Sequence, residues 1–249
     1  DALRDVPSAR ECRRILYPPK SWFRDFPLQA VWNMPDATIA KEVEKLRVKM
    51  HQFDEDCKKA DLSIRMVYAA AKKWNELFLK PKGEFAWFYR HMSLCYRKGS
   101  LMFLHAGIDD RIAGILNHSD WKHLNKQFRQ LMFGNPFEFY YGPFANIMRT
   151  KYRDVDMPLT RSGVKKLHLQ GIRAVVHGHR NLLHGQRLML RKGLLNVECD
   201  TTLDRNSRKR EGLKGVGAAV TVIHPEGYIL GISNDYPFIK LFDPKNIVK

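Results

Sequence analysis

Cysteine is scarce in this sequence, and the few cysteines are scattered. Only four occur, at Cys12, Cys57, Cys95 and Cys199, and no two have the Cys-x-x-Cys spacing of a thiolate metal site. A zinc site built from cysteines is therefore not expected. Widely separated cysteines are typical of proteins that keep their thiols reduced, so we expect free thiols and a cytoplasmic location.

Long apolar runs are also missing. No stretch approaches the roughly 18 consecutive apolar residues that a membrane helix requires, so no membrane partner is expected. Residues 1–14 (DALRDVPSARECRR) do not contain the apolar core of a signal peptide, and the missing initiator Met suggests a processed or trimmed chain. With 44% hydrophobic residues over 249 positions, a packed globular core is expected.

Acidic residues are sparse, and one long segment has none. Lys and Arg number 43 against 26 for Asp and Glu, which gives a net charge of +17. Between Asp156 and Glu198 no acidic residue occurs, while this segment contains eight Lys or Arg residues and four of the ten His residues. A solvated basic face is the ordinary interpretation. Histidines in such a segment favour a site for an anionic partner.

The first half of the sequence is typical of helices. The prolines Pro18, Pro19, Pro27 and Pro35 predict an irregular arm over residues 1–35. Apolar residues spaced by three and four from Ile39 to Cys57 predict a helix that begins after Pro35, with Asp36 as its N-cap. A second stripe runs from Ile64 to Phe78, after a turn at residues 60–63. Together they predict an antiparallel helical hairpin that packs a core, or alternatively serves for capping or oligomerisation.

The second half mixes strands with helices. Further helices are predicted over residues 84–97, from 109 or 110 to 116, 121–133 and 160–169. Strands are predicted over residues 100–104, 173–177, 186–190, 194–199, 216–223 and 228–232, with a polar loop at 201–215. The fold class is therefore α/β or α+β, with a sheet covered by helices.

Two predicted strands end in a histidine with a glycine one or two residues further along. These are FLHAGI at residues 103–108, with His105, and VVHGHRN at residues 175–181, with His177 and His179. The carboxyl edge of a sheet is where α/β proteins place ligands, and glycine allows a close approach to the backbone. Neutral imidazole is the commonest metal ligand, so the pattern predicts a metal site. A serine nucleophile is less favoured, because no Gly-x-Ser-x-Gly motif occurs.

Four short motifs together carry a family resemblance. FLHAGI is followed by Gly142–Arg149 (GPFANIMR), then by VVHGHRN and by LLNVECDTTL at residues 194–203. In order and spacing, over about residues 85–235, they resemble the later half of a calcineurin-like metallophosphoesterase, in the phosphoprotein phosphatase and diadenosine tetraphosphatase branch. The resemblance implies residues 1–83 as an arm plus hairpin, and 84–249 as half of a β-sandwich flanked by helices.

The resemblance also implies roles for individual residues. His105 and His179 would bind metal, in a centre of two Mn, Fe or Zn ions about 3.5 Å apart whose bridging water attacks phosphorus. Arg149 would bind the phosphate through its bidentate fork, and Arg180 is a further candidate for phosphate binding. Asp200, in the position of the family's Asp-Thr-Gly, would hold a loop. His177 and Arg180 match no family ligand; both are candidates for lining the pocket, and His177 alternatively for hydrogen-bonding a metal ligand.

The sequence departs from that family in its first half. The motifs that supply bridging Asp and Asn ligands, Gly-Asp-x-His, Gly-Asp-x-x-Asp and Gly-Asn-His-Asp/Glu, do not occur. The chain is then the later part of a longer protein, a subunit whose partner supplies the ligands, or a relative that binds without cleaving. Because two histidines cannot hold a dinuclear centre, we expect the 249-residue chain alone to be inactive.

The sequence thus predicts a metal-dependent phosphoesterase that acts on a phosphorylated protein, nucleotide or nucleic acid. The alternative is a non-enzymatic protein. One form is a basic nucleic-acid-binding protein, and the other is a scaffold that oligomerises through the helical hairpin. The residues that would contact nucleic acid lie in the polar loop, and they are Arg205, Arg208, Lys209, Arg210 and Lys214.

Overall fold

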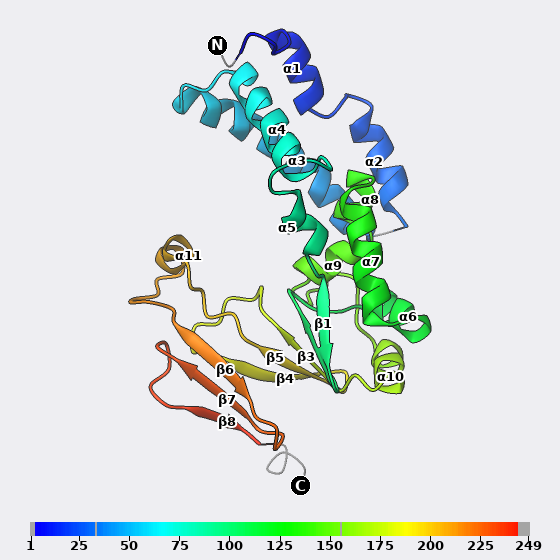
Figure 1. Cartoon of the computed structure of the whole chain (residues 1–249), viewed down its shortest axis with the longest axis vertical. Coiled ribbons are helices and arrows are strands. Elements are labelled where there is room, and N and C mark those ends of the chain that lie inside the picture. The colour runs from blue at the N-terminus through cyan, green and yellow to red at the C-terminus, as the bar shows by residue number, and fades with distance from the viewer. Residues whose placement is uncertain (1–2, 33, 155, 244–249) are drawn as a thin grey trace. The chain divides into compact units, whose positions relative to one another are not determined.

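The computed structural model describes residues 3–32, 34–154 and 156–243 (Figure 1). The chain divides into two compact units. One consists of Asp1–Met92 and Arg129–Tyr141, and the other of Ser93–Phe128 and Gly142–Lys249. The first is called here the helical unit and the second the sheet unit. Each is described by itself.

The helical unit is built from short helices around one long one. Trp22, Phe26 and Ala30 lie on one face of α2, and Phe26 and Ala30 form the core with Met34 and Ile39. Helix α1 packs against α4, α2 against α3, and α4 against α5. The bounds are α1 Ala9–Leu16, α2 Trp22–Ala30, α3 Asp36–Lys59, α4 Ile64–Phe78, α5 Ala86–His91 and α8 Pro136–Tyr141, with the end of α7 (Trp121–Met132).

The prediction of an irregular arm over residues 1–35 was wrong, because this segment contains α1 and α2. A capping box starts α1: the Ser8 hydroxyl accepts from the Glu11 N–H, and the Glu11 carboxylate accepts from the Ser8 N–H. Pro27 lies inside α2, where packing of Phe26 against Trp22 outweighs the lost hydrogen bond. Several prolines in a segment therefore do not exclude short helices between and around them.

The two predicted amphipathic helices form, as α3 and α4. The Ser63 hydroxyl caps α4 by accepting from the Met66 N–H, whereas the N-cap of α3 is Pro35, one residue before the predicted Asp36. The two helices do not pack mainly against each other. Helix α3 packs on α2, and α4 packs on α1. The two helices of the predicted hairpin therefore follow each other in the sequence, but each packs mainly against another helix.

The sheet unit contains two sheets (Figure 1). In the first, the order is β1-β2-β3-β5-β4; β2, β3 and β5 run parallel, and β1 and β4 are antiparallel edges. The second is the antiparallel sheet β6-β7-β8. The strands are β1 Cys95–Lys98, β2 Leu101–Leu104, β3 Ala174–His177, β4 Arg187–Arg191, β5 Leu194–Glu198, β6 Ala219–Ile223, β7 Ile229–Ser233 and β8 Lys240–Phe242.

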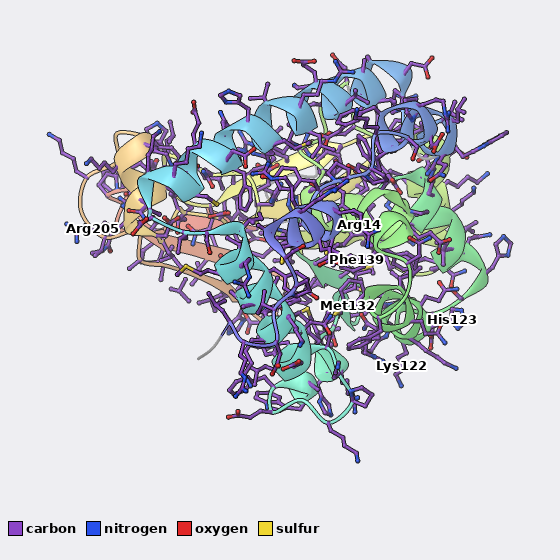
Figure 2. All side chains as sticks on the ribbon, turned by 90° about the horizontal axis from the view of Figure 1, so that it is seen from above. Arg14, Lys122, His123, Met132, Phe139 and Arg205 are labelled. Atoms are coloured by element: carbon purple, nitrogen blue, oxygen red, sulfur yellow. The ribbon has the colours of Figure 1, made fainter. Side chains whose placement is uncertain are left out.

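Helices accompany the five-stranded sheet. Helix α6 (Asp110–His118) packs against α10 (Arg161–Leu169) and α9 (Pro143–Arg149). Asp109 caps α6 through the Ile112 N–H, and Thr160 caps α10 through the Gly163 N–H. On α7, Lys122 and His123 are exposed (Figure 2), while Leu124 and Phe128 are buried. The mixed content confirms the α+β class.

Three predictions in this unit need correction. Residues 95–97 belong to β1 and not to a helix, because the buried Asn125 amide hydrogen-bonds the backbone of Leu94 and Cys95. The polar loop contains α11 (Arg205–Arg210), capped by Asp204. Strand β8 was missed, since three residues carry no periodicity.

All four cysteine thiols are free. Among the described residues, no helix has both the length and the apolar character that crossing a bilayer requires.

Candidate functional site

The parallel pairing of β2 and β3 brings the two histidine loops together. Leu101 pairs with Ala174 and Phe103 with Val176, so both strands end at the same edge of the sheet. Beyond the strands, the Gly178 N–H donates to the His105 carbonyl at 2.9 Å. The imidazole Nε2 of His105 lies 3.1 Å from Nδ1 of His179, with the rings inclined at 60°. Two side chains 74 positions apart thus meet at one point.

The backbone at His179 is strained. Its φ is +64°, and the Arg180 N–H donates to the Gly178 carbonyl at 2.8 Å, which closes a three-residue turn around His179. A non-glycine residue in such a turn costs on the order of 1–3 kcal/mol and is typical of functional sites. The turn directs the imidazole of His179 toward His105.

The two neighbouring glycines differ in what they allow. At Gly107 an added Cβ would lie 2.6 Å from the Tyr152 hydroxyl oxygen, so only glycine fits. At Gly178 an added Cβ would make an ordinary contact, 3.5 Å from Cβ of Asp200. The close approach predicted for the glycines is therefore required in the His105 loop and not in the His179 loop.

The separation of the histidine nitrogens suits a shared metal ion. With metal–nitrogen bonds of about 2.05 Å, two ligand nitrogens lie about 2.9 Å apart at a right angle and about 3.3 Å apart at a tetrahedral angle. The observed 3.1 Å falls between these values. In the described part of the chain, no group of three or more His, Cys, Asp or Glu residues could hold a metal. The same 3.1 Å separation is that of a hydrogen bond between the two imidazoles, and among the described residues no further side chain of these types completes a metal site around the pair.

The electrostatics favour a neutral imidazole at His179. Burial lowers its pKa below the ordinary value, and the charges of His105 and Lys151 lower it further. A hydrogen bond to the Arg149 backbone and the carboxylate of Asp200 act in the opposite direction, with smaller effects. The environment of His179 therefore disfavours the charged imidazolium form.

Arg149 and Asp200 both lie near the His179 ring, the first through its backbone and the second through its carboxylate. Arg149 is the last residue of α9, and its backbone interacts with the His179 ring. Asp200 follows β5; its carboxylate accepts from the Thr202 N–H at 3.0 Å, and its carbonyl accepts from the Leu182 N–H at 2.9 Å. Asp200 thereby holds the loop that faces Gly178.

His177 does not join the histidine pair. It is the last residue of β3 and is 2% exposed, with its ring edge-on to Tyr152. Burial lowers its pKa. Its Nε2 atom has no hydrogen-bond partner within the described residues. The buried His177 ring therefore packs inside the sheet unit, where its Nδ1 lies 3.2 Å from the Gly178 carbonyl at the start of the His179 loop.

A cluster of charges that sequence reasoning missed lies beside Arg180. Glu198, at the end of β5, is 0% exposed and accepts hydrogen bonds from Arg187 and Arg191. The Arg180 guanidinium lies 3.6 Å from the same carboxylate. The register of the β4–β5 hairpin places Arg187 opposite Glu198. Counting back from the Lys192-Gly193 turn would have predicted this pair.

The basic residues of the polar loop lie apart from these contacts. Arg208 is buried, and its guanidinium is paired with Asp235 at 2.7 Å, so it holds the loop in place. Arg205 projects from α11 (Figure 2) and lines a cavity of about 700 Å³ with Lys209 and Leu213. Nucleic-acid binding by this loop stays a prediction.

Comparisons with known proteins identify no family for the chain. No family model matches it, and no curated protein matches it. Similar solved structures include a cold-active protein tyrosine phosphatase (11% identity, TM-score 0.43, 64% of this chain and 44% of that one). Another is the cold-active protein-tyrosine phosphatase of a psychrophile, Shewanella sp. (13%, 0.42, 64% and 46%). A third is the I115M mutant of a cold-active protein tyrosine phosphatase (11% identity, TM-score 0.43, 77% of this chain and 52% of that one).

These findings correct the family assignment made from the short motifs. The chain spans about half the length of the similar structures, which carry the name protein tyrosine phosphatase and not that of a calcineurin-like metallophosphoesterase. No family model supports the calcineurin-like assignment either. Four motifs of a few residues each were too short to define a family. The function of the chain is argued below from its own residues.

Proposed function

We propose that the sheet unit carries part of a metal-dependent site that hydrolyses phosphate esters. The observation that supports this proposal is the 3.1 Å separation between Nε2 of His105 and Nδ1 of His179 at the carboxyl edge of two parallel strands. A divalent ion such as Mn, Fe or Zn, bound there with further ligands, would supply a Lewis acid and a hydroxide nucleophile. The substrate would be a phosphorylated protein, nucleotide or nucleic acid.

The residues of the chain would bind and orient the phosphate. His105 and His179 offer ring nitrogens, and burial keeps His179 neutral for that purpose. Lys151 contributes positive charge beside His179. Arg149, whose backbone contacts the His179 ring, and Arg180, which directly follows His179, would hold phosphate oxygens. Asp200 would keep the loop after β5 in position.

Metal binding tests the proposal without requiring turnover. We expect Zn²⁺ or Mn²⁺ to bind the wild-type chain in a calorimetric titration and to raise its melting temperature. His105→Ala and His179→Ala should each abolish this response, because a single imidazole remains. His184→Ala, which removes an exposed histidine of the same unit, is the matched control and should leave the response unchanged.

Two results would contradict the proposal. One is a metal response that persists in the double variant lacking His105 and His179. The other is a wild-type chain that shows no response at millimolar metal. Activity is a separate readout: with Mn²⁺ and an aryl phosphate, we expect no rapid turnover by this chain alone, since two ligands do not complete a centre.

A further inference from the structure

Glu198 is a buried carboxylate that three arginines share. It is fully shielded from solvent, and its two oxygens take hydrogen bonds from Arg187 on one side and from Arg191, at 2.5 Å, on the other. Arg180 lies 3.6 Å from the oxygen that Arg191 also contacts. Three positive charges therefore face one negative charge, and the cluster keeps an excess of positive charge.

The three arginine side chains differ in how much of their surface is exposed to solvent. The Arg191 side chain is 17% exposed and lies over the Tyr152 ring, 4.5 Å from its centroid. The side chains of Arg180 and Arg187 are more open, at 31% and 42%. Arg191 is thus the internal anchor, and the other two guanidiniums reach solvent.

The open guanidiniums retain unused hydrogen-bond donors. Each guanidinium has five N–H groups. Arg187 uses its Nε and Nη2 atoms on Glu198. Within the described residues, the side chain of Arg180 makes an ion pair with Glu198 but no hydrogen bond. Planar forks with free donors, held at a fixed place, match the oxygens of a phosphate.

The surroundings contain charges of both signs, since the Glu211 carboxylate accepts a hydrogen bond from the Asn181 side chain next to Arg180. The Lys240 ammonium donates to the Gln186 carbonyl at 2.9 Å, directly before Arg187 in the chain. No acidic residue occurs between Asp156 and Glu198 in the sequence, and the carboxylate that ends this segment is already enclosed by the arginines. An anion would therefore meet no competing carboxylate from this segment.

We propose that Arg180 and Arg187, held in place by Glu198, form a second anion subsite that binds a phosphate group of a polyphosphorylated substrate. The inference rests on the proposed function for its place in a reaction, because Arg180 directly follows His179. One phosphate would meet the histidine pair, and another would be held by the two arginines. Arg187 then determines specificity, since it favours substrates that carry a second phosphate.

Binding of inorganic phosphate and pyrophosphate to the metal-free chain tests the subsite directly. We expect both to bind at low ionic strength in a calorimetric titration. Arg187→Gln and Arg180→Gln should each weaken binding about tenfold or more, because each removes a charged donor. Arg187→Lys should recover only part of the loss, since an ammonium lacks the fork. Arg191 keeps its ion pair with Glu198 in these variants, and their melting temperatures check the fold.

Two controls separate this subsite from its alternatives. Arg173→Gln removes an exposed arginine at the opposite end of β3, and should leave the affinity unchanged. His105→Ala should abolish metal binding but leave phosphate binding to the metal-free chain intact, so that failure of the proposed function and failure of the subsite are told apart. Equal affinity in Arg187→Gln and wild type, an equal loss in Arg173→Gln, or no phosphate binding at all would overturn the inference.

Discussion

At the scale of single residues, left-handed backbone marks the places where the chain turns sharply. Lys192 has φ +53° and Gly193 has φ +98°, and these two residues join β4 to β5. A two-residue turn with both angles positive is the type that fits the twist of a hairpin. Glycine suits the second position, whereas lysine at the first position adopts a conformation that Asn adopts more readily.

Lys192→Asn is therefore expected to stabilise the protein. The gain should be about 0.5–1 kcal/mol, or a rise of about 1–3 °C in melting temperature, because Asn tolerates the left-handed region better than Lys does. Differential scanning calorimetry measures it. Gly193→Ala is the opposing variant and should lower the melting temperature; a decrease for Lys192→Asn would contradict this account of the turn.

The histidine pair was accessible to prediction at this scale, whereas the arginine cluster needs the strand register: the Lys192-Gly193 turn gives the Arg187–Glu198 pair but not the approach of Arg180. His105 and His179 each follow an apolar strand, and the end of a strand can be recognised from neighbouring residues alone. The contacts of Glu198 depend on which residues of β3, β4 and β5 lie opposite one another. His177 shows the limit: it stands in the same motif as His179, yet the pleat of β3 turns it into the interior.

At the scale of elements, the β4–β5 hairpin depends on the charge of Glu198. Burial raises the pKa of its carboxyl, but the hydrogen bonds from Arg191 and Arg187 lower it more, so the pKa lies below the ordinary value of 4.5. A depressed pKa contributes stability that is fully present above the unfolded-state value. This stability is lost as the pH falls through the lower, folded-state value.

We expect two consequences from replacing Glu198 by Gln. At neutral pH the free energy of unfolding should fall by about 2–3 kcal/mol, because the arginines lose their counter-charge, although the partly exposed Arg180 and Arg187 remain hydrated. Acidification from pH 6 to pH 4 should also destabilise the variant less than the wild type. Urea unfolding at the two pH values measures both. An identical pH dependence would show that the pKa of Glu198 is the same in the folded and unfolded states, which would contradict this account.

Local signals predicted elements well where the packing agreed with them. The helices α3, α4, α6, α7 and α10 and the strands β2 to β7 follow the apolar periodicity that the sequence shows. Errors arose where a distant side chain decides the structure. Asn125 pairs with the backbone of Cys95 and so ends the helical segment at α5. Such long-range contacts have no signature in the sequence near Cys95.

At the scale of the whole molecule, the two units differ in how much they bury. The long helix α3 has 24 residues, but Ile39 is its only residue described as buried, and none is buried in α4. In the sheet unit, β3 and β5 are almost wholly enclosed. Few buried apolar contacts mean that backbone hydrogen bonds open at a lower free energy.

Hydrogen exchange should therefore separate the units. Amides of α3 after Val43 and of α4 are expected to exchange at least tenfold faster than those of β2, β3 and β5, because the latter open only with the core of the sheet unit. Mass spectrometry of peptides from residues 44–78, 101–104 and 174–177 measures this difference. Equal protection in the two sets would contradict it and would indicate one cooperative core.

The hairpin from Arg187 to Glu198 carries two of the three arginines together with the carboxylate that they share, whereas His105 and His179 come from β2 and β3. Arg187, Arg191 and Glu198 are thus encoded in a different segment from the two histidines, whereas Arg180 directly follows His179. Substitutions within those twelve consecutive positions would therefore alter the arginine cluster while leaving His105, His179 and Arg180 unchanged.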